Sequence, residues 1–438
     1  MLAFYILLHM KSTIELFFDG IWYEAALIES GGRDRCTFEY LPEYVFGDIC
    51  QPVSLILPVS LESRQLMGEC PPFLLDMVPQ GNGRRYLTQR LGLTDSDDLV
   101  MPLIQHGAFN PVGRLRLDTA VAYANSVKED DDFLQRGFTL NEIVGRKEAF
   151  IEGLSRHGML GAGTTGLQGA SAKFMMVKNN EGLWCIDSFV NESDIASHWL
   201  LKLPRGKHET DQAILKSEAA YIKVARACGL RSYGETFHRD GMLFVPRFDR
   251  AIENGAVVRL HQESLASLAG HRSFGIRPNH FDLIHAFLPV VTDPVNEVIE
   301  YVKRDLLNLA IRNTDNHARN TAVQQLKDGT VQLTPVFDIA PMFMDREILV
   351  RASRWLDKSG RVINNFADVI EELPLENEAK NAVMLAIELF SKVIENLPLT
   401  MEECGVDADL IDQCEPHIDW VCESVDTVRG VEKNGWSR

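Results

Sequence analysis

Apolar residues along the chain follow two spacings, and the dominant one changes near residue 260. Before that point the apolar runs are short and are interrupted by glycine, proline and acidic residues, which is typical of strands and small helices. Beyond it the pattern is mainly helical, and residues 295–313 carry apolar side chains at the spacing of an amphipathic helix that ends before Asp315. The pattern predicts an α+β protein with a mixed α/β N-terminal part and an all-helical C-terminal lobe.

The same reading places the individual elements. Strands are expected at residues 14–18, 53–58, 174–178, 183–187, 197–204 and 242–248, with a brief one at 331–337. Helices are expected at residues 72–77, 86–93, 140–157, 215–228, 377–396 and 408–428. An acidic run at 128–132 is typical of a solvated linker. Three regions follow from this order: 1–125, 126–250 and 251–438.

Composition narrows the class of protein. A chain of 438 residues with 45% hydrophobic and 24% charged residues is typical of a soluble globular protein of two or three domains. Its formal charge of −18 argues against gripping nucleic acid unaided, because phosphate binding needs clustered lysine and arginine. No apolar run approaches the roughly 20 residues of a membrane helix. The apolar residues 2–8 favour an edge strand, or a start position assigned too far upstream, and not a targeting segment, since no basic residue precedes them.

Cysteine and histidine spacing gives no metal or disulfide pattern. The eight cysteines are scattered without a Cys-x-x-Cys pair, which favours buried thiols in a reducing cytoplasm. His271, His280 and His285 are spaced too irregularly for a zinc set. We therefore expect a cytoplasmic protein with neither a disulfide framework nor a zinc site.

Three oxygen-bearing side chains carry the strongest chemical signal. Asp315 and Asn320 lie five positions apart in Asn-Thr-Asp-Asn-His-Ala-Arg-Asn (313–320), and Asp338 follows 23 positions after Asp315. A protein kinase uses this spacing to place one catalytic carboxylate and two magnesium ligands around a phosphoryl group. Taken alone, the octapeptide is more typical of a turn rich in Asp and Asn than of an active site. The interpretation therefore needs partners elsewhere in the chain.

Candidate partners occur in the order of a kinase, although each has an ordinary alternative. The glycine-dense residues 161–173 would let backbone amides approach a phosphate, or form a plain connector. Lys202 would reach the phosphates, or face solvent from an edge strand. Glu218 would pair with Lys202, or be a first-turn glutamate favoured by the helix dipole. Residues 244–250 would join the lobes and receive adenine through backbone groups, or form an ordinary strand with an exposed Arg-Asp-Arg end.

Taken together, these residues resemble the HipA family, the kinase toxins of bacterial toxin–antitoxin pairs. The resemblance is carried by Leu-Lys-Leu-Pro (201–204), Arg-Phe-Asp-Arg (247–250), Leu-His-Gln-Glu (260–263), the 313–320 octapeptide and Leu-Thr-Pro-Val-Phe-Asp (333–338). Pro-Glu-Tyr (42–44) and Gln-Pro-Val-Ser-Leu-Ile-Leu-Pro (51–58) resemble the family's N-terminal module. The resemblance implies a two-lobed, protein-kinase-like fold: a HipA-type module, an N-lobe-like region and a C-lobe, in the order of the three regions above.

The resemblance also implies roles for particular residues. Asp315 would accept the proton of the attacking hydroxyl, and Asn320 and Asp338 would hold Mg²⁺. Around ATP, the resemblance places Gln168, Gly169, Ala170, Ser171, Ala172, Lys173, Lys202, Glu218, Pro246, Arg247, Phe248, His317, Ala318, Arg319, Asn320, Phe337 and Asp338. Arg319 stands where lysine is common, which keeps the charge but changes how it bonds phosphate.

One departure concerns self-regulation. The family's autophosphorylated serine would fall near Gly166, where this chain has none, although Thr164, Thr165 and Ser171 are close. Autoregulation by that route is therefore in doubt. Which of these hydroxyls could inherit the task stays open.

The leading hypothesis is an ATP- and Mg²⁺-dependent serine/threonine protein kinase of the HipA type that arrests growth. By resemblance, its substrate would be an aminoacyl-tRNA synthetase such as glutamyl-tRNA synthetase. A small HipB-like helix-turn-helix antitoxin would be its partner and would supply contact with DNA, in keeping with this chain's acidity. Two alternatives remain: a kinase acting on a small molecule or lipid, and a non-catalytic nucleotide-binding corepressor.

Overall fold

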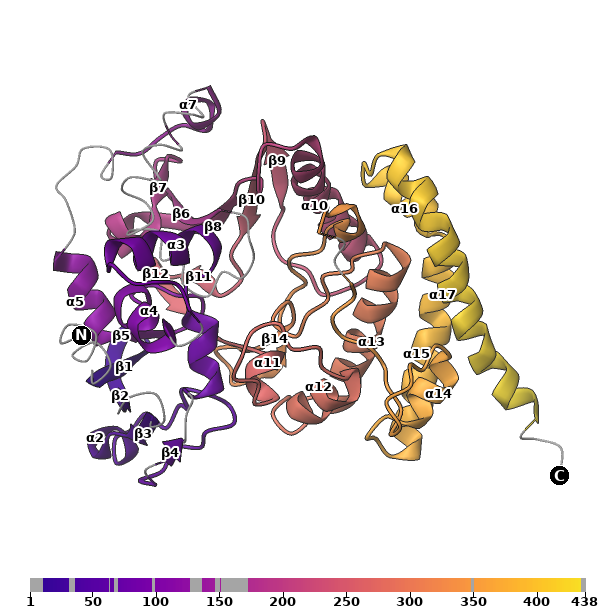
Figure 1. The fold of residues 1–438 in the computed structure, drawn as a ribbon, viewed down its shortest axis with the longest axis horizontal. Helices are drawn as coiled ribbons and strands as arrows, with labels where there is room; N and C mark the ends of the chain where they lie inside the picture. The colour runs from indigo at the N-terminus through magenta and orange to yellow at the C-terminus, as the bar shows by residue number, and fades with distance from the viewer. Residues whose placement is uncertain are drawn as a thin grey trace. The chain divides into compact units, whose positions relative to one another are not determined.

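The computed structural model describes residues 11–30, 36–62, 64–66, 70–96, 99–126, 136–145, 150, 172–347 and 350–434 (Figure 1). The chain forms two units. Unit 1 contains Met1–Arg205, Met242–Glu263 and Gly270–Phe274, and unit 2 contains Gly206–Gly241, Ser264–Ala269 and Gly275–Arg438. The three-region division drawn from the sequence stays a prediction.

The N-terminal part of unit 1 is built on an antiparallel sheet with strand order β4-β3-β2-β1-β5. In β1 (Lys11–Phe18), Ile14 and Leu16 are fully buried, whereas Thr13 and Glu15 between them are partly exposed. This alternation gives the sheet one apolar face, which packs into a single core with the neighbouring helices. The other elements are β2 (Ile21–Ser30), β3 (Cys36–Tyr40), α2 (Pro42–Val45), β4 (Arg64–Leu66), η1 (Pro72–Met77), α3 (Gly81–Arg90), α4 (Val100–Gly107), β5 (Leu115–Leu117) and α5 (Asp118–Ser126).

A second antiparallel sheet in unit 1 has the neighbouring strands β7, β6, β8 and β10. One of its faces is aromatic: the Trp184 ring lies 5.2 Å from that of Trp199 and 5.0 Å from that of Phe244. The elements of this part are α7 (Leu140–Gly145), β6 (Lys173–Asn179), β7 (Trp184–Ile186), η4 (Asp187–Phe189), η5 (Glu192–Asp194), β8 (Ile195–Lys202), β10 (Met242–Pro246), β11 (Arg250–Glu253), β12 (Ala256–Arg259) and β13 (His261–Ser264).

Unit 2 is organised around α13 (Pro294–Ala310), whose Val298, Val302 and Leu306 are fully buried. The long helices α15 (Asn377–Glu395) and α17 (Ala408–Asn434) pack on α13 and on each other (Figure 1). The remaining elements are α10 (Glu209–Ala227), β9 (Phe237–Arg239), α11 (Leu265–Leu268), α12 (His280–Phe287), β14 (Ala322–Gln325), β15 (Val331–Leu333), η6 (Met342–Met344), α14 (Phe366–Glu371) and α16 (Leu397–Glu403).

The prediction of an all-helical C-terminal part is wrong, because residues 251–438 include β14 and β15. These strands form an antiparallel hairpin in which Val323 faces Leu333. The turn between them has Gly329 at φ +89° and the Asp328 side chain accepting the Thr330 amide, which is turn chemistry that a helical pattern does not reveal. The mixed α/β class is confirmed.

The predicted strand at residues 53–58 is also wrong. The Leu57 amide donates to the Ser54 carbonyl, so the segment turns. Its Ser54 hydroxyl and Leu55 amide donate to Glu263, far along the sequence, at 2.7 and 2.9 Å. The strands expected near 14–18, 174–178, 183–187, 197–204 and 242–248 are confirmed, and so are the helices near 215–228, 295–313, 377–396 and 408–428.

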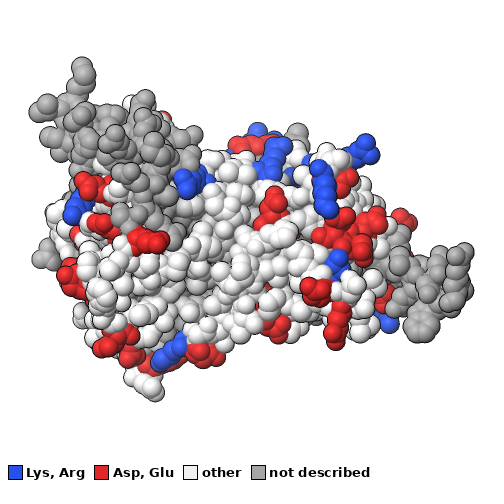
Figure 2. All heavy atoms as spheres, turned by 90° about the horizontal axis from the view of Figure 1, so that it is seen from below, with Lys and Arg blue, Asp and Glu red and all other residues white. Residues whose placement is uncertain are grey.

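Charge is mixed over the surface. On the face shown in Figure 2, lysine and arginine side chains lie singly or in small groups among aspartate and glutamate side chains. Within the described residues, no helix is both long and apolar enough to cross a bilayer.

Candidate active site

The predicted catalytic loop is the connection between α13 and β14 in unit 2. Helix α13 ends where Arg312 adopts a left-handed φ of +56°, and the Asn313 amide returns to the Asn308 carbonyl at 2.9 Å. The first amides of α11 donate to carbonyls of the loop, Ala266 to Ala318 at 3.2 Å and Leu265 to Thr321 at 2.9 Å. The loop is therefore held at both ends by backbone bonds.

Within this loop the structure brings the predicted catalytic residues together. The side-chain amide nitrogen of Asn320 donates to the backbone carbonyl of Asp315 at 2.7 Å, and the Asn320 backbone amide donates to the His317 carbonyl at 2.8 Å. His317 Nε2 lies 3.7 Å from Asp315 Oδ1, and about a third of the Asp315 side chain is exposed. Ala318 and Arg319 are buried. Because the Asn320 nitrogen is engaged, its carbonyl oxygen is the atom suited to a cation.

Asn320 and Asp338 flank the β14–β15 hairpin in sequence. Asn320 precedes β14 and Asp338 follows β15, and the Thr334 amide donates to the Ala322 carbonyl at 2.9 Å at the same end of the hairpin. Paired strands lie roughly 5 Å apart. The two predicted metal ligands thus leave the sheet from one end, although they are distant in sequence.

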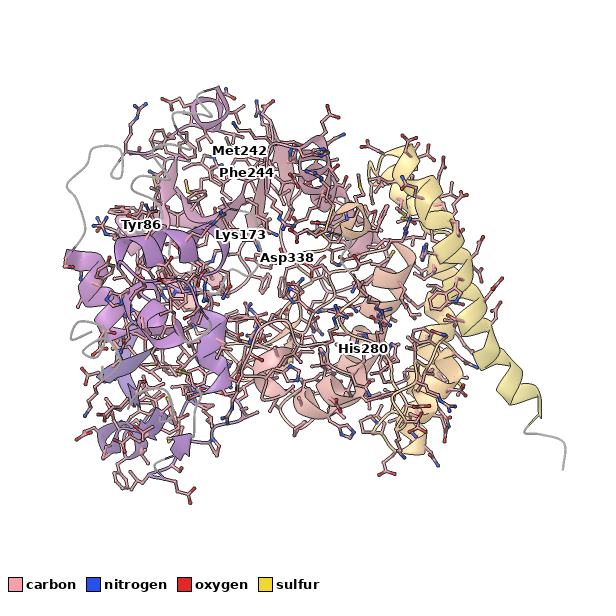
Figure 3. All side chains as sticks on the ribbon, viewed as in Figure 1. Tyr86, Lys173, Met242, Phe244, His280 and Asp338 are labelled. Carbon is pink, nitrogen blue, oxygen red and sulfur yellow. The ribbon has the colours of Figure 1, made fainter. Side chains whose placement is uncertain are left out.

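Asp338 itself has an unusual backbone, with φ at +51° (Figure 3). A left-handed conformation costs a non-glycine residue roughly 1–2 kcal/mol, and such residues concentrate at functional sites. Phe337 and Asp338 are half-buried, while Val336 and Ile339 beside them are buried. The flanking apolar residues anchor the segment and leave the Asp338 carboxylate at the surface of the core.

Buried ion pairs fix the chain just before Asp338. Glu297 on α13 accepts the Leu333 amide at 2.8 Å and pairs with Arg231 at 2.8 Å. Arg231 also donates to the Leu333 carbonyl at 2.6 Å, and its own carbonyl accepts the Val336 amide at 2.8 Å. Side chains therefore hold this segment where regular strand pairing has ended.

Asn316, which has no role in the sequence interpretation, braces the catalytic loop. Its side-chain oxygen accepts the amides of Ala352 and Ser353 at 3.1 and 3.3 Å, and its nitrogen donates to the Ser353 carbonyl at 3.2 Å. The residue next to Asp315 thus fixes a segment without regular structure, residues 350–356. Only its position beside Asp315 could have singled it out.

A buried cluster holds the same segment from the other side. Asp305 pairs with Arg351 and accepts the Trp355 indole N–H at 2.8 Å, and His280 lies 3.3 Å from it. Burial lowers the pKa of His280 to about 4 despite the nearby Asp305 carboxylate, so the imidazole is neutral at pH 7. Burial alone would raise the pKa of Asp305, but Arg351 and His280 outweigh it and lower that pKa.

Lys173 and Lys202 lie in unit 1, directly opposite each other on β6 and β8. Both are buried, at 8% and 4% exposure, and register partners project from the same face of a sheet. Strand β8 separates Lys173, labelled in Figure 3, from the strand β10 that carries Phe244. The two lysines therefore place positive charge on one face of the sheet. The solvent-facing alternative for Lys202 is wrong.

Residues 246–248 continue from β10. Pro246 is the register partner of Trp199, and the Arg247 amide donates to the His198 carbonyl at 3.0 Å. The Arg247 guanidinium is buried and bonds Asp187 and Asp249, so its contribution to a nucleotide is limited to its backbone. The alternative of an exposed Arg-Asp-Arg end is wrong, because Arg247, Asp249 and Arg250 are all buried.

Glu218 lies on the buried face of α10, with 6% exposure. The helix begins at Glu209, so Glu218 is in its third turn and the first-turn explanation is wrong. Burial of a carboxylate among apolar residues requires a charged or hydrogen-bonding partner. Its pairing with Lys202 stays a prediction.

The remaining predicted ATP contacts concern the glycine-dense loop. Residues 168–171, with Thr164 and Thr165, lie outside the described residues. Ala172 leads into β6, and its carbonyl accepts the Leu203 amide at 2.8 Å. The described residues contain no group of three or more His, Cys, Asp or Glu suited to a metal. Two protein ligands suffice for Mg²⁺, which takes its other oxygens from phosphates and water.

Comparison with known proteins places this arrangement in a family. A HipA N-terminal domain matches residues 23–118, and a HipA-like C-terminal domain matches residues 165–396. Two Sinorhizobium fredii proteins with provisional kinase names, Y4mE and Y4dM, are each 24% identical to the chain. Y4mE aligns with 73% of this chain and 76% of its own length, and Y4dM with 61% of each.

A solved structure shows the same fold. A chain from the Shewanella oneidensis MR-1 toxin–antitoxin complex of HipA, HipB and operator DNA covers 95% of this chain and 99% of itself. The TM-score is 0.66 at 16% identity. Because the HipA-like C-terminal domain alone spans more than half of the sequence, the protein belongs to the HipA kinase family.

Proposed function

We propose that the protein is an ATP- and Mg²⁺-dependent serine/threonine protein kinase of the HipA toxin type. The observation that carries this proposal is the β14–β15 hairpin, from one end of which both Asn320 and Asp338 depart. Asp315 lies in the same loop as Asn320, with its carboxylate partly exposed. This order of carboxylate, amide and second carboxylate is what in-line phosphoryl transfer to a hydroxyl requires.

The described residues would divide the work as follows. Asp315 would orient the substrate hydroxyl and accept its proton, while His317 limits the freedom of the carboxylate. Asn320 and Asp338 would hold Mg²⁺, which when bound supplies positive charge to the phosphate oxygens. Lys173 and Lys202 would contact the phosphates, a role that suits two buried cations on one face of a sheet.

The nucleotide base would meet unit 1 through its backbone. Pro246 has no amide but keeps its carbonyl, and Phe248 keeps its amide, so the two offer an acceptor and a donor to adenine. Residues 168–171 would cover the phosphates, as the family resemblance implies. Positioning and electrostatic stabilisation supply most of the rate enhancement in this kind of site.

The substrate and partner belong to the same proposal. A protein substrate, by family resemblance an aminoacyl-tRNA synthetase such as glutamyl-tRNA synthetase, would be phosphorylated in the cytoplasm to arrest growth. A HipB-like helix-turn-helix antitoxin would bind the kinase and bring it to DNA. The formal charge of −18 supports a division of labour in which the partner provides the basic surface.

The test is phosphoryl transfer from ATP labelled on its γ-phosphate, with purified protein and cell lysate, with and without a chelator of divalent cations. We expect label in protein, lost with the chelator and in Asp315→Asn. Asp328→Asn, an exposed carboxylate in the hairpin turn, is the matched control and should transfer normally. Label confined to small molecules would refute protein kinase activity, and ATP binding without transfer would indicate the corepressor alternative.

A further inference from the structure

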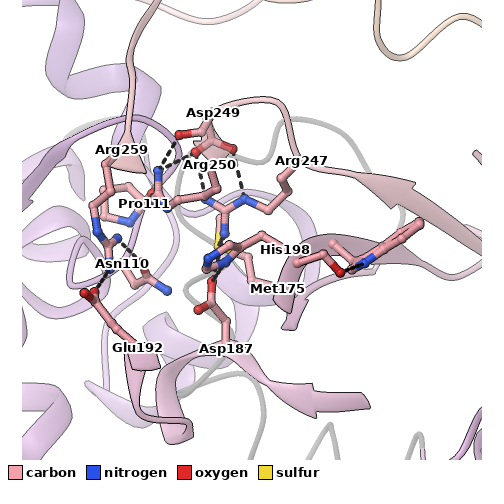
Figure 4. A network of polar contacts seen from close by, with 12 residues as sticks. Asn110, Pro111, Met175, Asp187, Glu192, His198, Arg247, Asp249, Arg250 and Arg259 are labelled. Carbon is pink, nitrogen blue, oxygen red and sulfur yellow. Dashed lines mark hydrogen bonds and ion pairs between the residues drawn. The ribbon is translucent and has the colours of Figure 1, made fainter. Parts of the chain in front are cut away.

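A buried charge network surrounds Arg247, and its other members, Asp187, Asp249 and Arg250, have been assigned no chemistry (Figure 4). Its centre is Asp249, which is 3% exposed. The Asp249 carboxylate accepts hydrogen bonds from Nε and Nη2 on one edge of the Arg247 guanidinium, at 3.0 and 2.7 Å, and from Arg250 at 2.7 Å. Arg247 reaches on to Asp187 at 2.9 Å. Three ion pairs thus meet at the end of β10: Arg247–Asp249, Arg250–Asp249 and Arg247–Asp187.

The network also holds the N-terminal part of unit 1. The Gly113 amide donates to Asp249 at 2.9 Å, and Arg250 donates to the carbonyls of Gly113 and Pro111 at 2.5 and 2.9 Å. These backbone atoms directly precede β5, an edge strand of the N-terminal sheet. Asp249 and Arg250 therefore tie one loop of the N-terminal sheet to the segment that follows β10.

Gly113 fits this contact closely. Its φ is +86°, which favours glycine, and a Cβ there would meet the Gln262 backbone at 3.5 Å. The 3.5 Å distance is an ordinary van der Waals contact, so it is the positive φ that favours glycine here. The hydrogen bonds that Asp249 and Arg250 make with Gly113 and Pro111 hold the 111–113 backbone beside residues 249–250.

The buried charges of this network compensate one another, so replacing one of them is expected to destabilise the others. Burial opposes the charge on each member, yet Arg247 and Arg250 hold the pKa of Asp249 well below its usual range. A buried carboxylate shared by two guanidinium groups is stable only while all three remain in place. Removing one charge leaves another buried without compensation, which is strongly destabilising.

We propose that Asp249 is a positioning residue for the nucleotide: it fixes residues 246–248 against the N-terminal sheet, so that this sheet contributes to ATP affinity. The inference rests on the proposed function, because it assumes that Pro246 and Phe248 receive adenine. Asp249 does not touch the nucleotide itself. It acts through Arg247 and through the backbone of Pro111 and Gly113.

The chain offers a matched control in Glu263. This carboxylate is also buried, at 2% exposure, and also tethers the N-terminal part of unit 1, through Ser54 and Leu55. It has no contact with Arg247 or Asp249 among the described hydrogen bonds. Asp249→Asn and Glu263→Gln therefore remove the same kind of charge, one bonded to Arg247 of the adenine segment and one bonded to Ser54 and Leu55.

The experiment is calorimetric titration of the full chain with ATP and Mg²⁺, together with kcat and KM for ATP and a thermal unfolding curve. We expect both variants to lower Tm, but only Asp249→Asn to weaken ATP binding, by about tenfold or more, with a smaller change in kcat. Equal ATP affinity in the two variants overturns the inference. If the wild type itself binds no ATP, the proposed function fails first, and the two failures are thereby distinguished.

A second variant covers the case in which Asp249→Asn does not fold. Arg250→Lys keeps a positive charge beside Asp249 but loses the fork that donates to both Pro111 and Gly113. Weakened ATP binding in Arg250→Lys supports the link between the N-terminal sheet and the nucleotide. Unchanged binding in this variant, with a folded protein, overturns it.

Discussion

Replacement of Asn316 by alanine tests whether residues 350–356 are held by the catalytic loop. The change removes three hydrogen bonds: two in which the Ala352 and Ser353 amides donate to the side chain, and one in which it donates to the Ser353 carbonyl. Alanine has no polar atom to replace them. The perturbation is confined to one side chain beside Asp315, so it separates bracing from chemistry.

The magnitude follows from the burial of Ser353, whose exposure is 0%. A buried backbone group that loses its partner costs about 1–3 kcal/mol. The Ser353 amide loses its partner, and its carbonyl loses one of two donors, since His280 also bonds the Ser353 backbone. The half-buried Ala352 amide can turn to water and contributes less. We expect the segment to open more readily by about 2–4 kcal/mol, since the three bonds share one side chain and are not additive.

The assay is hydrogen exchange of the Ala352 and Ser353 amides, read at single-residue resolution alongside urea unfolding of the full chain. Exchange should accelerate by a factor on the order of 100 in Asn316→Ala, which corresponds to the middle of that free-energy range. Asn180→Ala is the control, because Asn180 is an exposed asparagine with one 3.0 Å bond to the Ser193 carbonyl. Unchanged exchange at Ala352 and Ser353 would refute the bracing role.

Three further results are expected. Asp315→Asn should abolish phosphoryl transfer while ATP binding by calorimetry stays within about threefold, because the amide cannot accept the hydroxyl proton. The unfolding free energy should fall by about 3 kcal/mol in total as pH decreases from about 6.5 to about 4, since His280 takes up a proton in the unfolded chain first. Urea unfolding of wild type and His280→Gln across that pH range checks this. An equal dependence of the unfolding free energy on pH in both proteins would contradict it. Leu306→Ala should lower the unfolding free energy by about 2–5 kcal/mol, because Leu306 is fully buried in α13, and unfolding measured by circular dichroism would show it.

The periodicity of apolar residues predicted the helices and strands that are specified by their own local sequence. The helix expected at 295–313 is α13, because Val298, Val302 and Leu306 form one apolar stripe that local spacing fully reveals. The strands of the second sheet in unit 1 were predicted for the same reason. Strand β6, for example, carries a continuous buried apolar run, Phe174–Val177, which is typical of a strand covered on both faces.

The predictions failed where a distant residue decides the local conformation. Residues 53–58 have the apolar content of a strand, yet Glu263 takes the Ser54 hydroxyl and the Leu55 amide and turns the chain. The role of Asn316 depends on Ser353, 37 positions later. No local pattern reports such a pairing, because a side-chain amide bonded to a remote backbone leaves no periodic trace in sequence.

The three irregular segments around the proposed chemistry share one physical solution. Residues 246–248, 333–338 and 350–356 lie at the ends of strands or in isolated bridges, so ladder hydrogen bonds position them only in part. In each case a buried carboxylate adds further contacts: Asp249, Glu297 and Asp305. Each is paired with an arginine, whose several N–H groups fix direction as well as charge. Desolvating such pairs is costly and adds little net stability, so their use here is better explained by the need for definite positions than by the stability of the fold. In this chain, buried Asp–Arg and Glu–Arg pairs therefore indicate which loops must be held still, which the catalytic motif alone does not.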